Sequence, residues 1–106
     1  QIVHKAAITA CRPQPSFCVK EIYSFEILSS SHWQSQSMTN VFSPNYFIDV
    51  SDFVGKKLDA LRCYDSEIRI YPHARSYEAV ENLAKFRGST IGVNAAEAFC
   101  VERLIK

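Results

Sequence analysis

The change from strand to helix that sets the fold class lies at residues 46–67, YFIDVSDFVGKKLDALRCYDSE. Residues 46–50 form a short apolar run with the length and composition of a strand. From Phe53 onward apolar side chains recur at helical spacing to the end of the stretch, and charged side chains take the opposite face. Ser51 belongs to the residue types that favour a helix N-cap. The stretch predicts a short strand followed by an amphipathic helix.

A helix, a strand and a loop are predicted before this stretch. Residues 2–11 carry an apolar stripe at helical spacing, and Arg12-Pro13-Gln14-Pro15 ends the helix because proline cannot continue its hydrogen bonds. Residues 19–27 alternate between apolar and polar side chains, which predicts a strand. The polar residues 29–40 predict an irregular loop. Two short strands make a poor sheet alone, so we interpret them as edge strands of something larger.

Another helix and a terminal segment of undecided type are predicted after residue 67. Residues 68–75 form a connection, and Ser76 is the expected N-cap of a helix that Gly88 stops. Residues 89–106 include Ala95-Ala96-Glu97-Ala98-Phe99, where periodicity does not distinguish a helical turn from an extended arm. The predicted order is helix, strand, strand, helix, helix and a C-terminal arm, within one α/β domain that spans residues 1–106.

The composition of the 106 residues predicts a single globular domain and excludes several classes of protein. Hydrophobic residues make up 47% and charged residues 22%, unlike disordered or collagen-like chains. The formal net charge of +1 gives no reason to expect a nucleic-acid surface. No apolar run approaches the roughly 20 residues that cross a bilayer, so we expect no membrane insertion. Four cysteines without a C-x-x-C pair favour free thiols and a cytoplasmic location, although the spacing also permits a Cys11–Cys18 bond.

Local catalytic motifs do not occur in the sequence. His4, His32 and His73 stand in no H-x-x-H, H-E-x-x-H or H-x-D spacing, so the sequence contains no local metal-binding motif. The chain has three glycines and no phosphate-binding loop, which excludes a glycine-rich nucleotide site. Arg75 and Arg87 could bind an anionic or sugar ligand, or simply be solvated. The residues alone predict a small α/β unit without a self-contained active site.

Several short motifs follow one another along almost the whole chain in a specific order. They are Ile2-Val3-His4 through Ala10-Cys11-Arg12-Pro13, then residues 42–51, Lys57, Ala60-Leu61, Tyr64 and Ser66 in one helix, Pro72-His73-Ala74-Arg75-Ser76, Arg87-Gly88, Gly92 and Ala96-Glu97-Ala98-Phe99. In joint order and spacing they resemble the LmbE/PIG-L family of zinc-dependent de-N-acetylases. These enzymes remove acetyl groups from N-acetylglucosamine-type and related amide substrates. Glu67 after Ser66, and Ala95 before the last motif, are mild departures from the family pattern.

The resemblance implies a Rossmann-like α/β layer fold, of which this chain would be the C-terminal portion. In the family, a His and an Asp of an N-terminal His-Pro-Asp-Asp motif and a second His hold the zinc ion, which activates a water molecule. This sequence has no His-Pro-Asp-Asp, and none of its histidines matches a ligand position. We therefore expect no metal ligand, no catalytic residue and no activity in the chain alone. The resemblance offers His73, Arg75 and Glu97 as substrate or rim contacts.

Three functional hypotheses stay open. In the first, the chain is the C-terminal portion of a de-N-acetylase, and a missing N-terminal half supplies the zinc site. In the second, it is a free-standing truncated relative that acts as a small non-catalytic binding or oligomerising protein, because unpaired strand edges and apolar faces favour self-association. In the third, which is the least favoured, it is an independent hydrolase that uses His73 with a cysteine or a glutamate. The expected partners are accordingly the N-terminal half or further copies of the chain.

Overall fold

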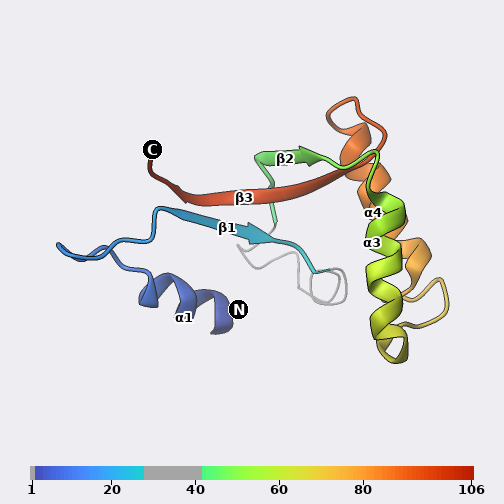
Figure 1. Ribbon diagram of the computed structural model, residues 1–106, viewed down its shortest axis with the longest axis horizontal. Coiled ribbons are helices and arrows are strands. Elements are labelled where there is room, and N and C mark those ends of the chain that lie inside the picture. Colours follow the sequence, from blue (N-terminus) through green and yellow to red (C-terminus); the bar gives the residue numbers. More distant parts are fainter. Residues whose placement is uncertain (1, 28–41) are drawn as a thin grey trace.

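The computed structural model describes residues 2–27 and 42–106, in which a three-stranded sheet is flanked by helices (Figure 1). The elements in chain order are α1 (Ile2–Ala10), β1 (Glu21–Phe25), β2 (Tyr46–Asp49), α3 (Val54–Leu61), the 3-10 helix η1 (Arg62–Glu67), α4 (Tyr77–Ser89) and β3 (Ala96–Leu104). The loop predicted at residues 29–40 lies outside the described residues. Within the described ranges, no helix has the length and apolar character needed to cross a membrane.

The sheet has the order β1-β3-β2, and both outer strands pair antiparallel with β3. The strands predicted at residues 19–27 and 46–50 are thus confirmed as its two edges. The segment of undecided type is the central strand, whose nine residues make it the longest of the three. A mixed α/β architecture is confirmed. The Rossmann-like order stays a prediction, because the described sheet is purely antiparallel.

The structure corrects two details of the predicted helix after β2. Ser51 is not its N-cap, because the cap position of α3 is Phe53, which makes no side-chain hydrogen bond. The Ser51 hydroxyl instead donates to Asp49 Oδ1 at 2.6 Å, and its oxygen accepts the Ala95 N–H at 3.3 Å. Ser51 therefore joins the end of β2 to the residue before β3. The single helix predicted to residue 67 also tightens into the 3-10 helix η1 at Arg62.

The prediction for α4 is right at its N-terminus and wrong at its C-terminus. Ser76 is the N-cap, and its hydroxyl accepts the Ala79 N–H at 3.1 Å. Gly88 does not follow the helix but lies buried inside its last turn. A Cβ atom on Gly88 would lie 2.6 Å from the Val93 carbonyl oxygen and 2.7 Å from Ala95 Cα. The glycine is therefore needed for the close approach of α4 to the chain that enters β3.

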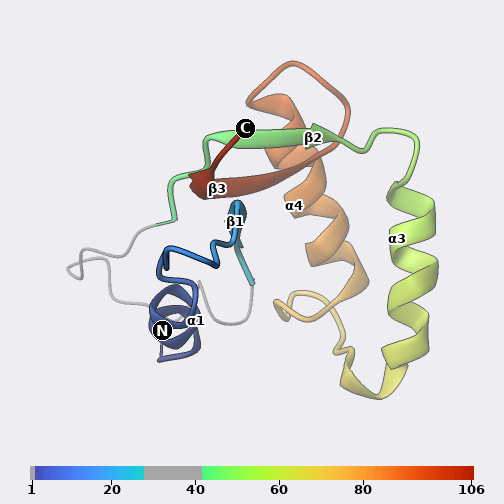
Figure 2. The same ribbon diagram turned by 60° about the vertical axis from the view of Figure 1, so that its left-hand side comes forward.

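The buried core consists of small side chains where α4 meets β3. Among the described residues, the buried hydrophobic side chains are all alanines: Ala84, Ala95, Ala96 and Ala98. Figure 2 shows α4 running up to the sheet, with α3 beside it and α1 at the other end of the strands. Small residues let the helix and the strand approach closely, so the large apolar side chains are left half-buried or exposed around this contact.

Replacing Gly88 with alanine should destabilise the protein by about 1–3 kcal/mol, because the new methyl group meets backbone atoms that cannot move aside cheaply. Gly55 is the matched control, since a Cβ there meets nothing within 4 Å and the residue lies in α3. Gly55→Ala should stabilise the protein by about 0.5–1 kcal/mol through its helix propensity. Urea unfolding measures both changes, and equal effects of the two substitutions would contradict the packing argument.

The hydrogen bonds around Asp49 should be visible in its titration. The Ser51 hydroxyl and N–H both donate to this carboxylate and lower its pKa from the ordinary value of 3.8. Because the pKa is lower in the folded state, these bonds stabilise the fold above about pH 4 and lose that effect as the pH falls through the folded pKa. Ser51→Ala should raise the pKa of Asp49 toward 3.8, as measured by NMR. An unchanged pKa would show that the hydroxyl is not the main donor.

Candidate functional site

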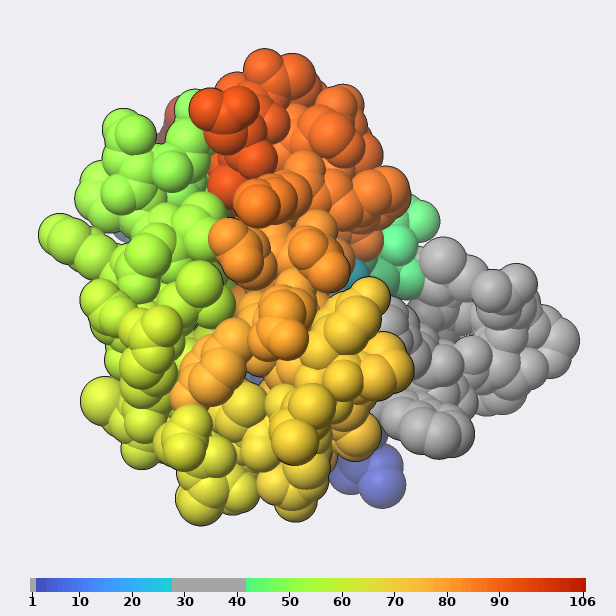
Figure 3. Space-filling model, turned by 90° about the vertical axis from the view of Figure 1, so that its right-hand side faces the viewer, coloured from blue at the N-terminus to red at the C-terminus, as the bar shows by residue number. Residues whose placement is uncertain are grey.

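Two adjoining hollows lie between the sheet and the helices α3 and α4. The smaller has a volume of about 110 Å³ and the larger about 410 Å³. Glu26, Lys57 and Leu83 line both, so the two hollows form one crevice. Figure 3 shows the elements that wall it, with α3 (green) and α4 (orange) side by side and the loop 68–75 (yellow) below them. The larger hollow has the size of a site for a small organic molecule.

The larger hollow is lined by both apolar and charged side chains. Its apolar side chains come from the end of β1, from α3, from the loop 68–75 and from α4: Ile27, Leu61, Ile68, Ala74, Val80 and Leu83. The polar side chains that line it are Glu26, Lys57, Tyr64, Glu67 and Arg75. Small-molecule sites have this composition, in which apolar walls supply contact area and a few polar groups fix the orientation of the ligand.

An ion pair between Arg87 and Glu26 forms one end of the crevice. Arg87 Nε donates to Glu26 Oε2 at 2.8 Å, and Arg87 NH2 donates to Oε1 at 3.1 Å. The two side chains are only 17% and 12% exposed. The guanidinium also lies 5.6 Å from the ring centroid of Phe42 and 5.4 Å from that of Phe86, which are cation–π distances. This bidentate pair fixes the residue after β1 against α4.

A second ion pair crosses the crevice from α3 to β3. Lys57 Nζ lies 2.5 Å from Glu97 Oε1, and both side chains are somewhat more than one-third exposed. Because solvent reaches the pair, its two charged groups can exchange a partner for a ligand at modest cost. Lys57 offers up to three donors and Glu97 offers acceptor oxygens, so the pair can bind hydroxyl and amide groups.

The residues predicted to contact substrate occupy different places. Glu97 lines the smaller hollow, and Arg75 lines the larger one, where its NH1 lies 3.9 Å from Glu67 Oε2. His73 is exposed and lines neither hollow. Its Nδ1 accepts the Arg75 N–H at 3.0 Å, so the imidazole helps to shape the loop that carries Arg75. A ligand contact for His73 itself stays a prediction.

The described residues do not fit a zinc site. In residues 2–27 and 42–106 no group of three His, Cys, Asp or Glu side chains is arranged to hold a metal ion. The two carboxylates that line the smaller hollow, Glu26 and Glu97, are each paired with a cation. Polar groups that are already paired in this way can bind and orient a ligand. No metal-dependent step is assigned to them.

The sequence did not reveal the partners of the two ion pairs. Arg87 and Glu97 each drew attention, but their partners lie 61 and 40 residues away along the chain. Lys57 looks like an ordinary charged residue on the solvent face of a helix. Glu26 stands between Phe25 and Ile27 at a predicted strand end. A charged residue between two large apolar residues is the only local sign that Glu26 has a partner.

Removing the Arg87 side-chain charge should destabilise the protein because it leaves the Glu26 carboxylate buried without a partner. We expect Arg87→Met to lower the free energy of unfolding by about 2–4 kcal/mol. Arg62→Met is the matched control, because Arg62 pairs with Asp59 at an exposed site. Its effect should stay within about 0.5 kcal/mol. Chemical unfolding measures both values. A loss below about 1 kcal/mol for Arg87→Met would contradict this expectation, because it would show that water can solvate the Glu26 carboxylate in place of the guanidinium.

No protein-family model matches this chain, and no curated protein matches it significantly.

Proposed function

We propose that this chain is the C-terminal portion of a de-N-acetylase similar to the LmbE/PIG-L family. The complete enzyme would have a Rossmann-like fold and a cytoplasmic location. Its substrate would be of the N-acetylglucosamine type or a related amide. In this proposal the crevice binds and orients the substrate. In the same proposal an N-terminal half supplies the metal and the catalytic base, as the family resemblance implies; among residues 2–27 and 42–106 no group of three potential ligands is arranged to hold a metal ion.

One observation carries the proposal. Four of the motifs that resemble the family are far apart in the sequence, yet some of their members line the same crevice, whereas residues 2–13, residues 42–51 and Gly92 do not line it. Those that line it come from α3, from the loop 68–75, from α4 and from β3: Lys57, Leu61, Tyr64, Ala74, Arg75, Arg87 and Ala96-Glu97-Ala98-Phe99. The motif residues that do line the two hollows of the crevice support a shared role in binding, whereas Ser76 and Gly88 serve the packing of α4.

The charges of the crevice suit a neutral polar ligand. Arg87 is paired with Glu26, Lys57 with Glu97, and Arg75 faces Glu67. Cationic and anionic groups are therefore balanced among the apolar side chains that line the crevice. Such a site offers donors and acceptors to hydroxyl and amide groups without a strong field that would select an ion. A sugar amide, which has an apolar ring face and a polar edge, has the matching chemistry.

A second candidate function is that of a small non-catalytic oligomerising protein. The observation that favours it is the number of large apolar side chains at the surface. Phe25, Ile48 and Phe86, for instance, are 64%, 46% and 57% exposed. Surfaces of this kind mark interaction sites in soluble proteins. This function requires no substrate, so ligand binding separates it from the first candidate.

Titration with N-acetylglucosamine tests the proposal. The amide NMR signals of residues around Arg75, Lys57 and Glu97 should shift saturably, with a Kd in the range of about 1–10 mM that is typical of one small sugar on an open site. Arg75→Gln should weaken binding about tenfold, because it removes the charged donors at the rim. Arg69→Gln is the matched control, since Arg69 is on the same loop but binds the carbonyl groups of Ser66 and Ile68.

The 106-residue chain should release no acetate from the sugar, with or without added zinc. Glucosamine, which lacks the acetyl group, should bind more weakly. Linear shifts without saturation, or equal effects of the two arginine substitutions, would reject the crevice as the substrate site. Acetate release that depends on His73 would instead favour an independent hydrolase.

A further inference from the structure

The backbone of Arg75 is fixed by two hydrogen bonds within the loop 68–75. The Arg69 N–H donates to the Arg75 carbonyl oxygen at 3.2 Å, and the Arg75 N–H donates to His73 Nδ1 at 3.0 Å. Ala74 and Arg75 both line the larger hollow of the crevice. The two bonds therefore set the position of residues that wall the proposed ligand site, and only the bond to His73 involves a titratable group.

The turn that contains His73 leads directly into α4. The His73 N–H donates to the Ile70 carbonyl oxygen at 3.1 Å, and the His73 carbonyl oxygen accepts the Ser76 N–H at 3.1 Å. Ser76 is fully buried and caps α4. The main chain of His73 thus holds the turn at both ends, whereas its ring holds Arg75 alone. Protonation or replacement of the ring removes the second contact and leaves the first in place.

The bond from the Arg75 N–H to His73 exists in only one protonation state of the ring. A neutral imidazole has one N–H donor and one acceptor nitrogen, so a ring that accepts at Nδ1 carries its proton at Nε2. A second proton, taken up from water, binds Nδ1 and makes both nitrogens donors. Two N–H groups then face each other and the hydrogen bond is lost. Imidazole groups undergo this change between about pH 5 and 8.

The charged groups near the loop leave the protonated ring without an ion-pair partner among the described residues. None of the ion pairs found there includes His73. The loop itself carries Arg69, Tyr71 and Arg75. The elements that adjoin it in sequence, η1 and the first turn of α4, carry Asp65, Glu67, Tyr77 and Glu78. Asp65 accepts the Tyr77 hydroxyl, and Glu67 faces Arg75. Across the larger hollow, Glu26 and Lys57 are paired with Arg87 and Glu97.

We propose that His73 is a positioning residue that makes ligand binding in the crevice depend on pH. The neutral ring holds Arg75 and Ala74 at the hollow, and protonation releases them. The inference rests on the proposed function, because it takes the crevice as the ligand site. Only molecules with the loop in place bind the ligand, so the apparent Kd rises as protonation lowers their fraction. Loss of one hydrogen bond of this kind corresponds to a change of about three- to tenfold.

Titration with N-acetylglucosamine at about pH 7.5 and about pH 5.5 tests the inference. The sugar has no group that titrates in this range, so a change in Kd belongs to the protein. The wild-type Kd should be about three- to tenfold higher at the lower pH. His73→Asn should bind equally at both pH values, because an asparagine oxygen accepts the N–H two residues on and does not titrate. His73→Ala should bind with the weaker affinity at both.

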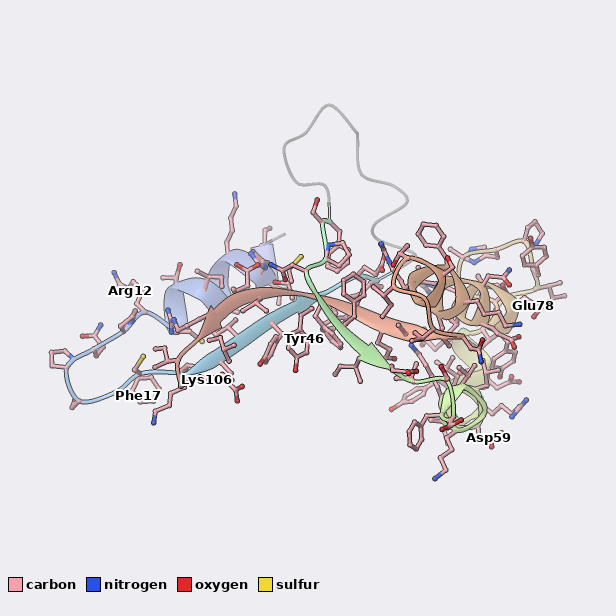
Figure 4. All side chains as sticks on the ribbon, turned by 90° about the horizontal axis from the view of Figure 1, so that it is seen from above. Arg12, Phe17, Tyr46, Asp59, Glu78 and Lys106 are labelled. Atoms are coloured by element: carbon pink, nitrogen blue, oxygen red, sulfur yellow. The ribbon has the colours of Figure 1, made fainter. Side chains whose placement is uncertain are left out.

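His4→Asn is the matched control. His4 is exposed and lies in α1, and Figure 4 shows α1 and the labelled Glu78 of α4 at opposite ends of the molecule. This variant should keep the pH dependence of the wild-type chain. A wild-type Kd that is equal at both pH values overturns the inference. So does a pH dependence that persists in His73→Asn, because the titrating group would then lie elsewhere.

The NMR spectrum of the ligand-free chain separates this inference from the proposed function. The Arg75 amide signal should move with pH in the wild-type chain and much less in His73→Asn. The neutral His73 ring should carry its proton at Nε2, which long-range proton–nitrogen spectra detect. If the sugar binds at neither pH, the proposed function fails, and the Arg75 signal still decides whether the ring holds the loop. An Arg75 signal indifferent to pH, or a neutral ring protonated at Nδ1, overturns the inference even if the sugar binds.

Discussion

The bidentate contact between Arg87 and Glu26 is the interaction on which the arrangement of the sheet and the helices depends. It joins the last turn of α4 to the residue after β1, at two distances of 2.8 and 3.1 Å. Because Arg87 precedes Gly88, the same helical turn that pairs with β1 also meets the chain that enters β3. A charged pair and a close backbone contact thus fix one helix against two strands. The crevice exists because these two contacts hold α4 at that position.

Close packing of small residues has a consequence for the rest of the surface. The contact of α4 with β3 uses glycine and alanine, which bring the backbones together but bury little apolar area for each residue. The large apolar side chains have no place in such a contact. They lie instead in the crevice and on the face of the sheet that carries Tyr46 and Ile48, where the described chain covers them incompletely. The same geometry therefore produces both a ligand-sized hollow and an apolar sheet face.

The sequence predicts the elements that carry their own local signals. Ser76 is followed by an apolar periodicity and caps α4 as expected, and the alternation of residues 19–27 marks β1. The central strand was not predicted, because apolar and polar residues alternate along a strand only where one face of the sheet is exposed to solvent. The side chains of Ala96, Glu97 and Ala98 are all at least half-buried, so polarity does not report their direction. Gly88 and Ser51 were misread for a related reason. Their roles depend on Ala95, a residue brought close only by tertiary packing.

The pairing of the charged groups around the crevice could not be predicted from the sequence. The family resemblance indicated His73, Arg75 and Glu97, of which Arg75 and Glu97 line the crevice and His73 does not, and a substrate contact for each of them stays a prediction. Pairing decides what these side chains can select. An unpaired arginine would favour an anion, whereas arginine and lysine groups that already face carboxylates present balanced donors and acceptors. In the proposed function, the substrate preference of the crevice therefore depends on contacts between distant segments. For that reason the charge balance around the hollow, more than any single residue, supports a neutral sugar amide as its ligand.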